Sequence, residues 1–262
     1  MNREKIIDYI VAWLKEYAQN AGMKGFVVGV SGGIDSALTS TLCARTGLEV
    51  LCLEMPIHQS ESQVTRAANH IGWLKTHHPN VRSEWINLTP VFDSLLGVLP
   101  DVDSEEERFM SLANTRARLR MTSLYYFAAL EKYLVAGTGN KVEDFGVGFY
   151  TKYGDGGVDL SPIADLLKTE VYELARHLGI REEILNAPPT DGLWGDNRTD
   201  EDQIGASYPE LEWAMAMDEQ GKKAGDFEGR EQEVFRIYKH LNTVNRHKML
   251  PIPVCEIPDS LK

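Results

Sequence analysis

The stretch FVVGVSGGIDS at residues 26–36 decides the fold of this chain. Its apolar start, residues 26–30, predicts a buried strand. Gly32 and Gly33 follow, and they permit a tight turn that lets the backbone approach a ligand closely. Apolar residues from Ile34 onward recur at helical spacing and predict a helix after the turn. Because the first N–H groups of a helix have no partners within it, this strand–turn–helix unit predicts a phosphate cradle.

Two better-known phosphate cradles are excluded by the residues of this turn. A Walker A loop requires a lysine before its Ser or Thr, whereas Ile34 and Asp35 precede Ser36 here. The dinucleotide spacing G-x-G-x-x-G is absent as well, because Ser31 stands at its second glycine. The remaining pattern, S-G-G-x-D-S, places a carboxylate inside an anion site, which indicates a metal ion that bridges Asp35 to phosphate. The alternative is a strand-to-helix turn that holds no ligand.

The composition of the 262 residues is that of a globular enzyme, with 43% hydrophobic and 25% charged residues. This length suffices for one large domain, and we expect residues 1–262 to form it. The formal net charge of -12 disfavours nucleic-acid binding, which depends on Lys and Arg. No stretch approaches the ~20 apolar residues of a membrane span, and no signal peptide is evident. Three cysteines without a C-x-x-C pair favour a cytoplasmic protein.

Strand-like and helix-like segments alternate through the first half of the chain. We predict strands at residues 26–30, 49–55, 84–88 and 133–138. Helices are expected at residues 3–19, 34–45 and 109–132, and another begins after Ser60. This alternation predicts an α/β fold, a doubly wound parallel sheet flanked by helices.

The order of these strands locates the ligand site. If the second and third strands extend the sheet on one side of the first strand, and the fourth lies on its other side, the strand order reverses between the first and fourth. Ligands of such sheets bind at that switch point, outside the carboxyl ends of the strands. Two glycine-bearing turns, residues 31–33 and 137–139, follow these two strands. We therefore expect both turns to line one crevice.

The second half of the chain is less regular. Residues 146–157 (GVGFYTKYGDGG) read as a loop, and residues 188–205 are polar and turn-rich, which makes them a candidate lid. Helices are expected at residues 168–178, 208–220 and 231–242, before an extended, proline-bearing tail.

Several motifs together resemble those of the NAD synthetase family, within the N-type ATP pyrophosphatases. They are SGGIDS, GTGNKVED, TKYGDGGVDLSPIADLLK, NAPPTDGLWGDNRTDEDQIG and the late pair His247-Lys248, and their order and spacing match as well. SGGIDS alone occurs in several ATP pyrophosphatases, whereas TKYGDGG discriminates better. The resemblance implies an adenine nucleotide alpha hydrolase-like sheet with strand order 3-2-1-4-5.

The resemblance also implies the reaction. The family makes NAD, the last step of NAD biosynthesis, from deamido-NAD, ATP and ammonia. ATP adenylates the nicotinate carboxylate, pyrophosphate leaves, and ammonia displaces AMP. Positioning and charge neutralisation drive such a displacement, so no side chain is required as acid, base or nucleophile. The region with family motifs spans nearly the whole chain, which leaves no room for an amidase domain, so we expect free ammonia rather than glutamine as the nitrogen donor.

Carried over residue by residue, the resemblance assigns an ATP site and a magnesium site. The ATP contacts would be Gly29, Val30, Ser31, Gly32, Gly33, Ile34, Asp35, Ser36, Thr138, Lys168 and Thr190. Asp35 and Glu143 would bind Mg2+, a hard cation that prefers carboxylates and phosphate oxygens. Lys168 opens a predicted helix, where a cation is unfavourable unless it meets an anion. The alternative for Glu143 and Lys168 is an ordinary solvated side chain.

The implied deamido-NAD contacts are Arg118, Lys152, Asp159, His247 and Lys248. A helix cannot turn Arg116, Arg118 and Arg120 to one face, and the resemblance selects Arg118. A solvated helix face and a flexible basic tail are the alternatives. Residues 140–142 depart from the pattern of the family, which leaves the route of that loop open.

The family forms homodimers that share the deamido-NAD site, so we expect a homodimer here. Two other functions stay open at this point. One is another ATP pyrophosphatase, such as a tRNA-modifying sulfurtransferase or GMP synthetase, although the missing C-x-x-C pairs and the acidic charge weigh against the tRNA enzyme. The other is a nucleotide sensor that has lost catalysis, against which the presence of both Asp35 and Glu143 speaks.

Overall fold

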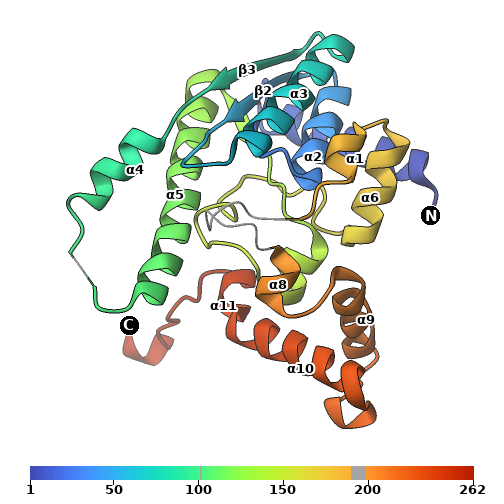
Figure 1. Cartoon of the computed structure of the whole chain (residues 1–262), viewed down its shortest axis with the longest axis vertical. Helices are drawn as coiled ribbons and strands as arrows, with labels where there is room; N and C mark the ends of the chain where they lie inside the picture. Colours follow the sequence, from blue (N-terminus) through green and yellow to red (C-terminus); the bar gives the residue numbers. More distant parts are fainter. Residues whose placement is uncertain (101, 190–198) are drawn as a thin grey trace.

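Four parallel strands form the sheet at the centre of the computed structural model, which describes residues 1–100, 102–189 and 199–262. The strands are β1 (Gly25–Gly29), β2 (Glu49–Glu54), β3 (Val81–Trp85) and β4 (Tyr133–Val135). Their order, β3-β2-β1-β4, confirms the predicted switch point between β1 and β4. Figure 1 labels β3 and β2 on one side of this sheet.

Among the described residues, the expected fifth strand of the sheet does not form. Its place beside β4 is taken by a single parallel bridge between Ala136 and Leu160. Gly156 and Gly157 precede this bridge and Pro162 follows it. Glycine weakens a strand and proline cannot donate to the ladder, so the pairing stays short.

The third strand lies at residues 81–85 rather than at the predicted 84–88. The prediction followed the apolar residues Ile86 and Leu88, which continue the chain beyond the strand. The strand itself is at the edge of the sheet and pairs only with β2. Such a strand tolerates the polar Arg82, Ser83 and Glu84, which hid its position in the sequence.

Alternating side chains of the strands divide the core between the two faces of the sheet. Phe26 and Val28 pack with α1 (Arg3–Asn20), α2 (Ile34–Arg45), α3 (Glu61–His77) and α6 (Lys168–His177). Val27 points the other way, toward α4 (Thr89–Leu96) and α5 (Glu105–Glu131). This period of two is that of a strand buried on both faces. The sequence did not predict α4, whose first turn holds Pro90.

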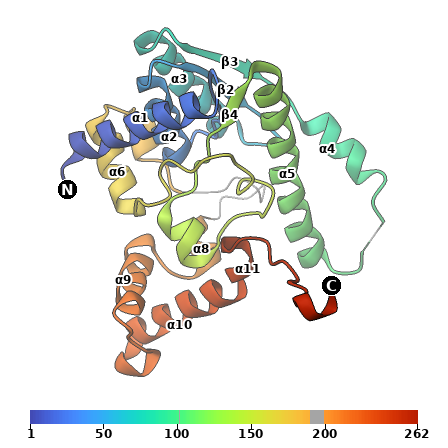
Figure 2. The same ribbon diagram turned by 180° about the vertical axis from the view of Figure 1, so that it is seen from behind.

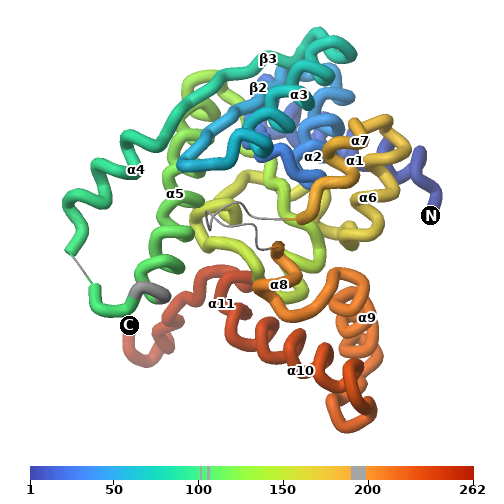
Figure 3. Tube along the Cα trace, in the orientation of Figure 1, coloured from blue at the N-terminus to red at the C-terminus, as the bar shows by residue number. Residues whose placement is uncertain are grey.

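A second hydrophobic cluster is formed by helices that lie below the sheet in Figures 1 and 2. It joins α9 (Tyr208–Glu219) and α10 (Gly229–Val244) to the π-helical turn η1 (Val142–Val147) that follows β4. Short helices complete the chain: α7 (Glu182–Leu185) lies beside α2 and α6 (Figure 3), while α8 (Asp200–Ile204) precedes α9 and α11 (Arg246–Met249) follows α10. The candidate lid lies largely outside the described residues.

Candidate active site

The glycine turn after β1 forms the expected cradle at the N-terminus of α2. Gly32 has a φ of +81°, and a Cβ at this position would lie 2.8 Å from the Gln63 carbonyl oxygen. Only glycine fits so closely against α3 in this conformation. Ser36 braces the turn from within, because its hydroxyl donates to the Gly33 carbonyl and accepts from the Ser31 N–H.

A crevice of about 280 Å³ opens at the carboxyl ends of β1 and β4. Both glycine turns line it, as the sequence predicts. The described residues among the predicted ATP contacts all line it, namely Gly29, Val30, Ser31, Gly32, Gly33, Ile34, Asp35, Ser36, Thr138 and Lys168, together with Glu143. Thr190 lies outside the described residues. The structure therefore brings these side chains together, and their contacts with ATP stay a prediction.

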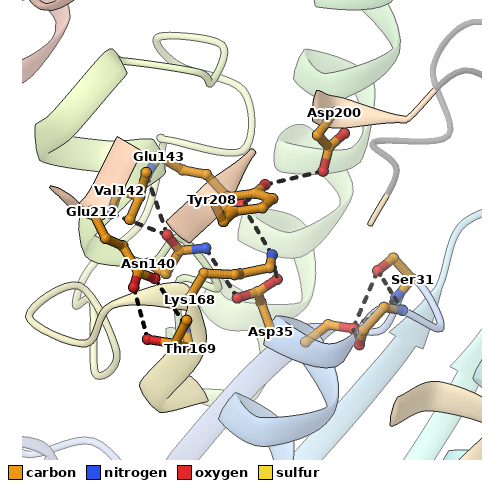
Figure 4. Close-up of polar contacts among 12 residues, drawn as sticks. Ser31, Asp35, Asn140, Val142, Glu143, Lys168, Thr169, Asp200, Tyr208 and Glu212 are labelled. Atoms are coloured by element: carbon orange, nitrogen blue, oxygen red, sulfur yellow. Dashed lines mark hydrogen bonds and ion pairs between the residues drawn. The ribbon is translucent and has the colours of Figure 1, made fainter. Parts of the chain in front are cut away.

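Lys168 joins the two predicted magnesium ligands. Its ammonium lies 2.5 Å from Asp35 Oδ2 and 3.0 Å from Glu143 Oε1 (Figure 4). Only 3% of the Lys168 side chain is exposed. The cation at the start of α6 therefore meets two anions, which explains how a lysine is accommodated at an N-terminus with a positive dipole.

The electrostatics of this cluster favour a cation. Burial alone would lower the pKa of Lys168, but the Asp35 and Glu143 carboxylates outweigh it and raise that pKa above its ordinary value. Burial raises the pKa of Asp35, and the Lys168 ammonium opposes this rise. Nearby, burial raises the pKa of Asp144 to about 8, with the neighbouring carboxylates adding to it. The two carboxyl groups of Asp35 and Glu143 thus face a single ammonium group, that of Lys168, in this part of the crevice.

Tyr208 belongs to the cluster although nothing in the sequence singled it out. Its hydroxyl donates to Glu143 Oε1 at 2.6 Å and lies 3.2 Å from Asp200 Oδ2. Its ring lies 4.7 Å from the Lys168 ammonium. Burial raises the pKa of Tyr208 well above its ordinary value, so the hydroxyl stays protonated and donates. The capping pattern of Ser207 and Glu210 indicates a helix start, but not where the ring points.

These residues fit magnesium held jointly with a nucleotide. Across residues 1–100, 102–189 and 199–262, no group of three or more His, Cys, Asp or Glu side chains gathers to hold a metal. Asp35 and Glu143 already share one cation, the Lys168 ammonium. Mg2+ is commonly bound by one or two carboxylates with phosphates and water completing its octahedron. Two carboxylates beside a phosphate cradle match that requirement.

Four of the five predicted deamido-NAD contacts lie together. Arg118 donates to the Lys152 carbonyl at 3.4 Å, and Lys152 donates to the His247 carbonyl at 2.7 Å. Lys248 donates to the carbonyls of Gly148 and Tyr150. Residues of α5, the loop after η1 and the C-terminal segment therefore meet at one place.

The carboxylate of Asp159, the fifth predicted contact, forms hydrogen bonds with other groups of the protein. It accepts hydrogen bonds from the Val135 N–H and the Tyr125 hydroxyl, so it holds the following loop against β4. Its contact with deamido-NAD stays a prediction. The neighbours of Arg118 point elsewhere, as predicted, since Arg116 lies over the Phe92 ring and Arg120 donates to the Met55 carbonyl.

Residues 242–248 form hydrogen bonds that fix the end of η1 and the loop that follows it. Asn242, Asn245 and Lys248 lie three residues apart, and each donates to backbone carbonyls of residues 145–150. The approach is close, because a Cβ on Gly148 would lie 2.4 Å from the Asn245 Cβ. The C-terminal helices therefore fix the start of the TKYGDGG segment.

The parallel sheet, the glycine cradle and the carboxylate pair at the switch point define a nucleotide-binding α/β enzyme. The model of the NAD synthase family matches residues 6–251, and the chain belongs to this family. It is 38% identical to the NH(3)-dependent NAD(+) synthetase of Carboxydothermus hydrogenoformans, over 88% of this chain and 93% of that protein. The predicted type of enzyme, an NAD synthetase, is confirmed.

Two solved structures resemble the whole chain, each at 28% identity. The NMN synthetase of Francisella tularensis has a TM-score of 0.83 and covers 99% of both chains. The NH3-dependent NAD synthetase of Campylobacter jejuni, in complex with the nitrate ion, has a TM-score of 0.78 over 98% of this chain and 100% of that one. The predicted parallel sheet flanked by helices is thereby confirmed as the fold of this family.

Proposed function

We propose that the chain amidates the nicotinate carboxyl of deamido-NAD with ammonia, using ATP and releasing AMP and pyrophosphate. One observation carries this proposal: in a chain of the NAD synthase family, the glycine cradle, the paired carboxylates and Lys168 line one crevice. The relatives named NH(3)-dependent NAD(+) synthetase support the same reaction.

The N–H groups at the start of α2 serve the phosphates of ATP. They lie at a helix N-terminus, where the dipole favours negative charge. Lys168 adds a full positive charge at the same crevice. Together they would hold pyrophosphate as it leaves and stabilise the charge that develops on it. The adenylated intermediate forms on the substrate, so the enzyme requires no nucleophile of its own.

Asp35 and Glu143 are the residues that would hold Mg2+. When bound, Mg2+ neutralises phosphate charge and helps to orient the leaving pyrophosphate. The Lys168 ammonium binds the same oxygens and would have to leave them for a metal ion to be held there. Lys168 is then free to pair with phosphate. ATP as co-substrate agrees with the family, while the metal is part of this proposal.

The cluster of Arg118, Lys152, His247 and Lys248 would bind deamido-NAD, whose diphosphate is an anion that Arg and Lys side chains attract. Support comes from the side-chain-to-backbone hydrogen bonds that bring these residues together from three separate segments. The site then draws on residues from Asp35 to Lys248, which favours residues 1–262 acting as one domain.

We further propose a homodimer. Exposed aromatic residues form a stripe on α1, where Tyr9 is 74% exposed and Trp13 and Tyr17 follow at intervals of four. Tyr126 and Leu130 are similarly exposed on α5. Such surfaces are typical of protein interfaces. Sedimentation that shows a monomer at micromolar concentration with substrates bound would contradict the dimer.

No described helix of the structure is long and apolar enough to span a bilayer. We propose a cytoplasmic location, supported by three cysteines that carry free thiols. Cell fractionation tests it.

The decisive experiment incubates the chain with deamido-NAD, ATP, magnesium and ammonium. The expected products are NAD, AMP and pyrophosphate in equal amounts. Parallel reactions with XMP, tRNA and no acceptor distinguish the other ATP pyrophosphatases and a sensor without turnover.

The likeness to an NMN synthetase favours a second acceptor, the mononucleotide counterpart of deamido-NAD. Comparing kcat/KM for the two acceptors decides between them. A higher value for deamido-NAD supports the function proposed here, and a higher value for the mononucleotide replaces it.

A further inference from the structure

Asn140 occupies the turn between β4 and η1 and is completely buried. It lies in the segment whose route the sequence left open. Its side-chain N–H donates to Asp35 Oδ1 at 3.1 Å. Its side-chain oxygen accepts from the N–H groups of Val142 and Glu143, at 3.1 and 3.2 Å. One amide thus contacts both segments that carry a predicted magnesium ligand (Figure 4).

The two arms of this amide have different tasks. The oxygen caps the first turn of η1 and so fixes the backbone of Glu143. The nitrogen holds the carboxylate of Asp35, which lies 105 residues earlier in the chain, on α2. An amide is planar and carries a donor beside an acceptor, so it links the two segments in one fixed geometry. A carboxylate would lack the donor, and an apolar side chain would lack both groups.

The remaining oxygens show why this link matters. Asp35 Oδ2 and Glu143 Oε1 both accept from Lys168, which is a long and adaptable side chain. Glu143 Oε1 also accepts from Tyr208. If a metal ion displaces the ammonium, the Lys168 bridge between the two carboxylates is lost. The Asn140 amide is a bridge that does not depend on Lys168.

We propose that Asn140 is a positioning residue that sets the separation of Asp35 and Glu143 for a divalent cation. This inference rests on the magnesium assignment of the proposed function. Partners of metal ligands characteristically orient them, and their loss weakens metal binding. A capping role alone would leave the metal unaffected once the turn has folded.

The variant Asn140→Ser separates the two arms. A serine hydroxyl caps a helical turn well, so the Val142 and Glu143 N–H groups keep an acceptor. The side chain is too short to reach Asp35. Asn80→Ser is the matched control, because the Asn80 amide is half-buried and donates only to the backbone carbonyls of Ala44 and Leu48. Asn140→Thr serves as a second variant with the same cap.

The experiment compares an α,β-methylene analogue of ATP with and without Mn2+, by calorimetric titration of the full-length chain. The ratio of the two affinities measures how far the metal strengthens nucleotide binding. In Asn140→Ser we expect this ratio to fall about tenfold, with binding of the metal-free analogue unchanged. Asn80→Ser should lower the melting temperature, but its ratio of affinities with and without Mn2+ should equal that of the natural chain.

The outcomes distinguish a failure of the role of Asn140 from a failure of the magnesium assignment on which it rests. A natural chain whose binding shows no gain from Mn2+ would overturn the magnesium site and the role of Asn140 with it. A clear gain that folded Asn140→Ser and Asn140→Thr retain within twofold would overturn the role of Asn140 alone. A fall of both affinities in equal measure would assign Asn140 a purely structural role and would also overturn the inference.

Discussion

The ammonium of Lys168 lies 2.5 Å from Asp35 Oδ2, beside the glycine turn that we propose holds phosphate. A carboxylate next to a phosphate cradle is unfavourable without a cation, and the protein supplies one from the start of α6. The same ammonium reaches Glu143. Any metal ion that binds these carboxylates therefore competes with a side chain of the protein, and this competition leads to the first prediction.

Lys168→Met should strengthen Mn2+ binding in the absence of nucleotide by about tenfold or more. Methionine removes the ammonium and leaves two carboxylates in need of a cation. Turnover should fall at the same time, because the positive charge at the phosphate site is lost. Calorimetric or EPR titration measures the binding. The control is Lys141→Met, whose partner Asp165 is 99% exposed. Equal Mn2+ affinity in all three proteins would refute the competition.

Asp35→Asn should nearly abolish turnover, because it removes a proposed magnesium ligand. The variant should also destabilise the folded protein, because the Asp35 carboxylate pairs with the Lys168 ammonium. Loss of a hydrogen bond between charged groups should lower the free energy of unfolding by about 2 kcal/mol. Urea denaturation measures this, with the fully exposed Asp165→Asn as control. Activity near normal at limiting magnesium would count against the assignment.

His70 should make the protein less stable in weak acid. It is fully buried beside the Ser40 hydroxyl, and burial lowers its pKa to about 4. Between the ordinary pKa of histidine, about 6.5, and pH 4, the unfolded chain takes up a proton that the folded chain does not. The stability that depends on neutral His70 is therefore fully present above pH 6.5. Toward pH 4 this effect lowers the free energy of unfolding by about 3 kcal/mol.

The variant His70→Gln isolates this effect, because an amide can still bond Ser40 but does not titrate. Urea unfolding at pH 7, 6 and 5 should show a shallower loss of stability in the variant than in the natural chain. Identical slopes in the two proteins would show that His70 does not cause the loss.

Free ammonia should be the nitrogen donor, and glutamine should not replace it. An amidase uses a reactive thiolate, but Cys43 and Cys52 are buried in the core, and burial raises the pKa of Cys52 to about 12. The exposed Cys255 lies in the C-terminal tail. The rate at fixed total ammonium should rise with pH as the free base increases.

The measurement supplies isotopically labelled glutamine or labelled ammonium to the purified chain. Label should enter the NAD amide from ammonium only. Incorporation from glutamine at a comparable rate, in the absence of contaminating ammonium, would reverse this conclusion.

The sequence was informative wherever one local rule governs the structure. The apolar run of β1, the two glycines after it and the helical spacing beyond them act within a few residues, so they predict the cradle. The resemblance implied the order of the strands, and the rule for ligand sites in parallel sheets then predicted the crevice at the switch point. The resemblance supplied the predicted roles of Asp35, Glu143 and Lys168, which stay predictions.

The rest depends on contacts between distant segments, which no local pattern encodes. Asn140 and Tyr208 are ordinary polar residues in sequence, and their importance arises from partners 105 and 65 residues away. The exact position of β3 was also missed. It lies at the edge of the sheet, and its polar residues are as typical of a loop as of a strand. For Asn140 and Tyr208 the cause is burial, since only the folded core limits which partners a polar group can reach.

The bonds from Asn245 and Lys248 to the loop after η1 also bear on how the protein is made. Val147 and Gly148 obtain these donors from residues 98 and 100 positions later in the chain. At a synthesis rate of roughly 5–20 residues per second, a ribosome delivers those donors about 5 to 20 seconds after the loop. During that interval the nascent chain can already assemble the strands and the glycine turn. Until Asn245 and Lys248 are synthesised, the carbonyls of the segment that leads into TKYGDGG can accept hydrogen bonds only from water.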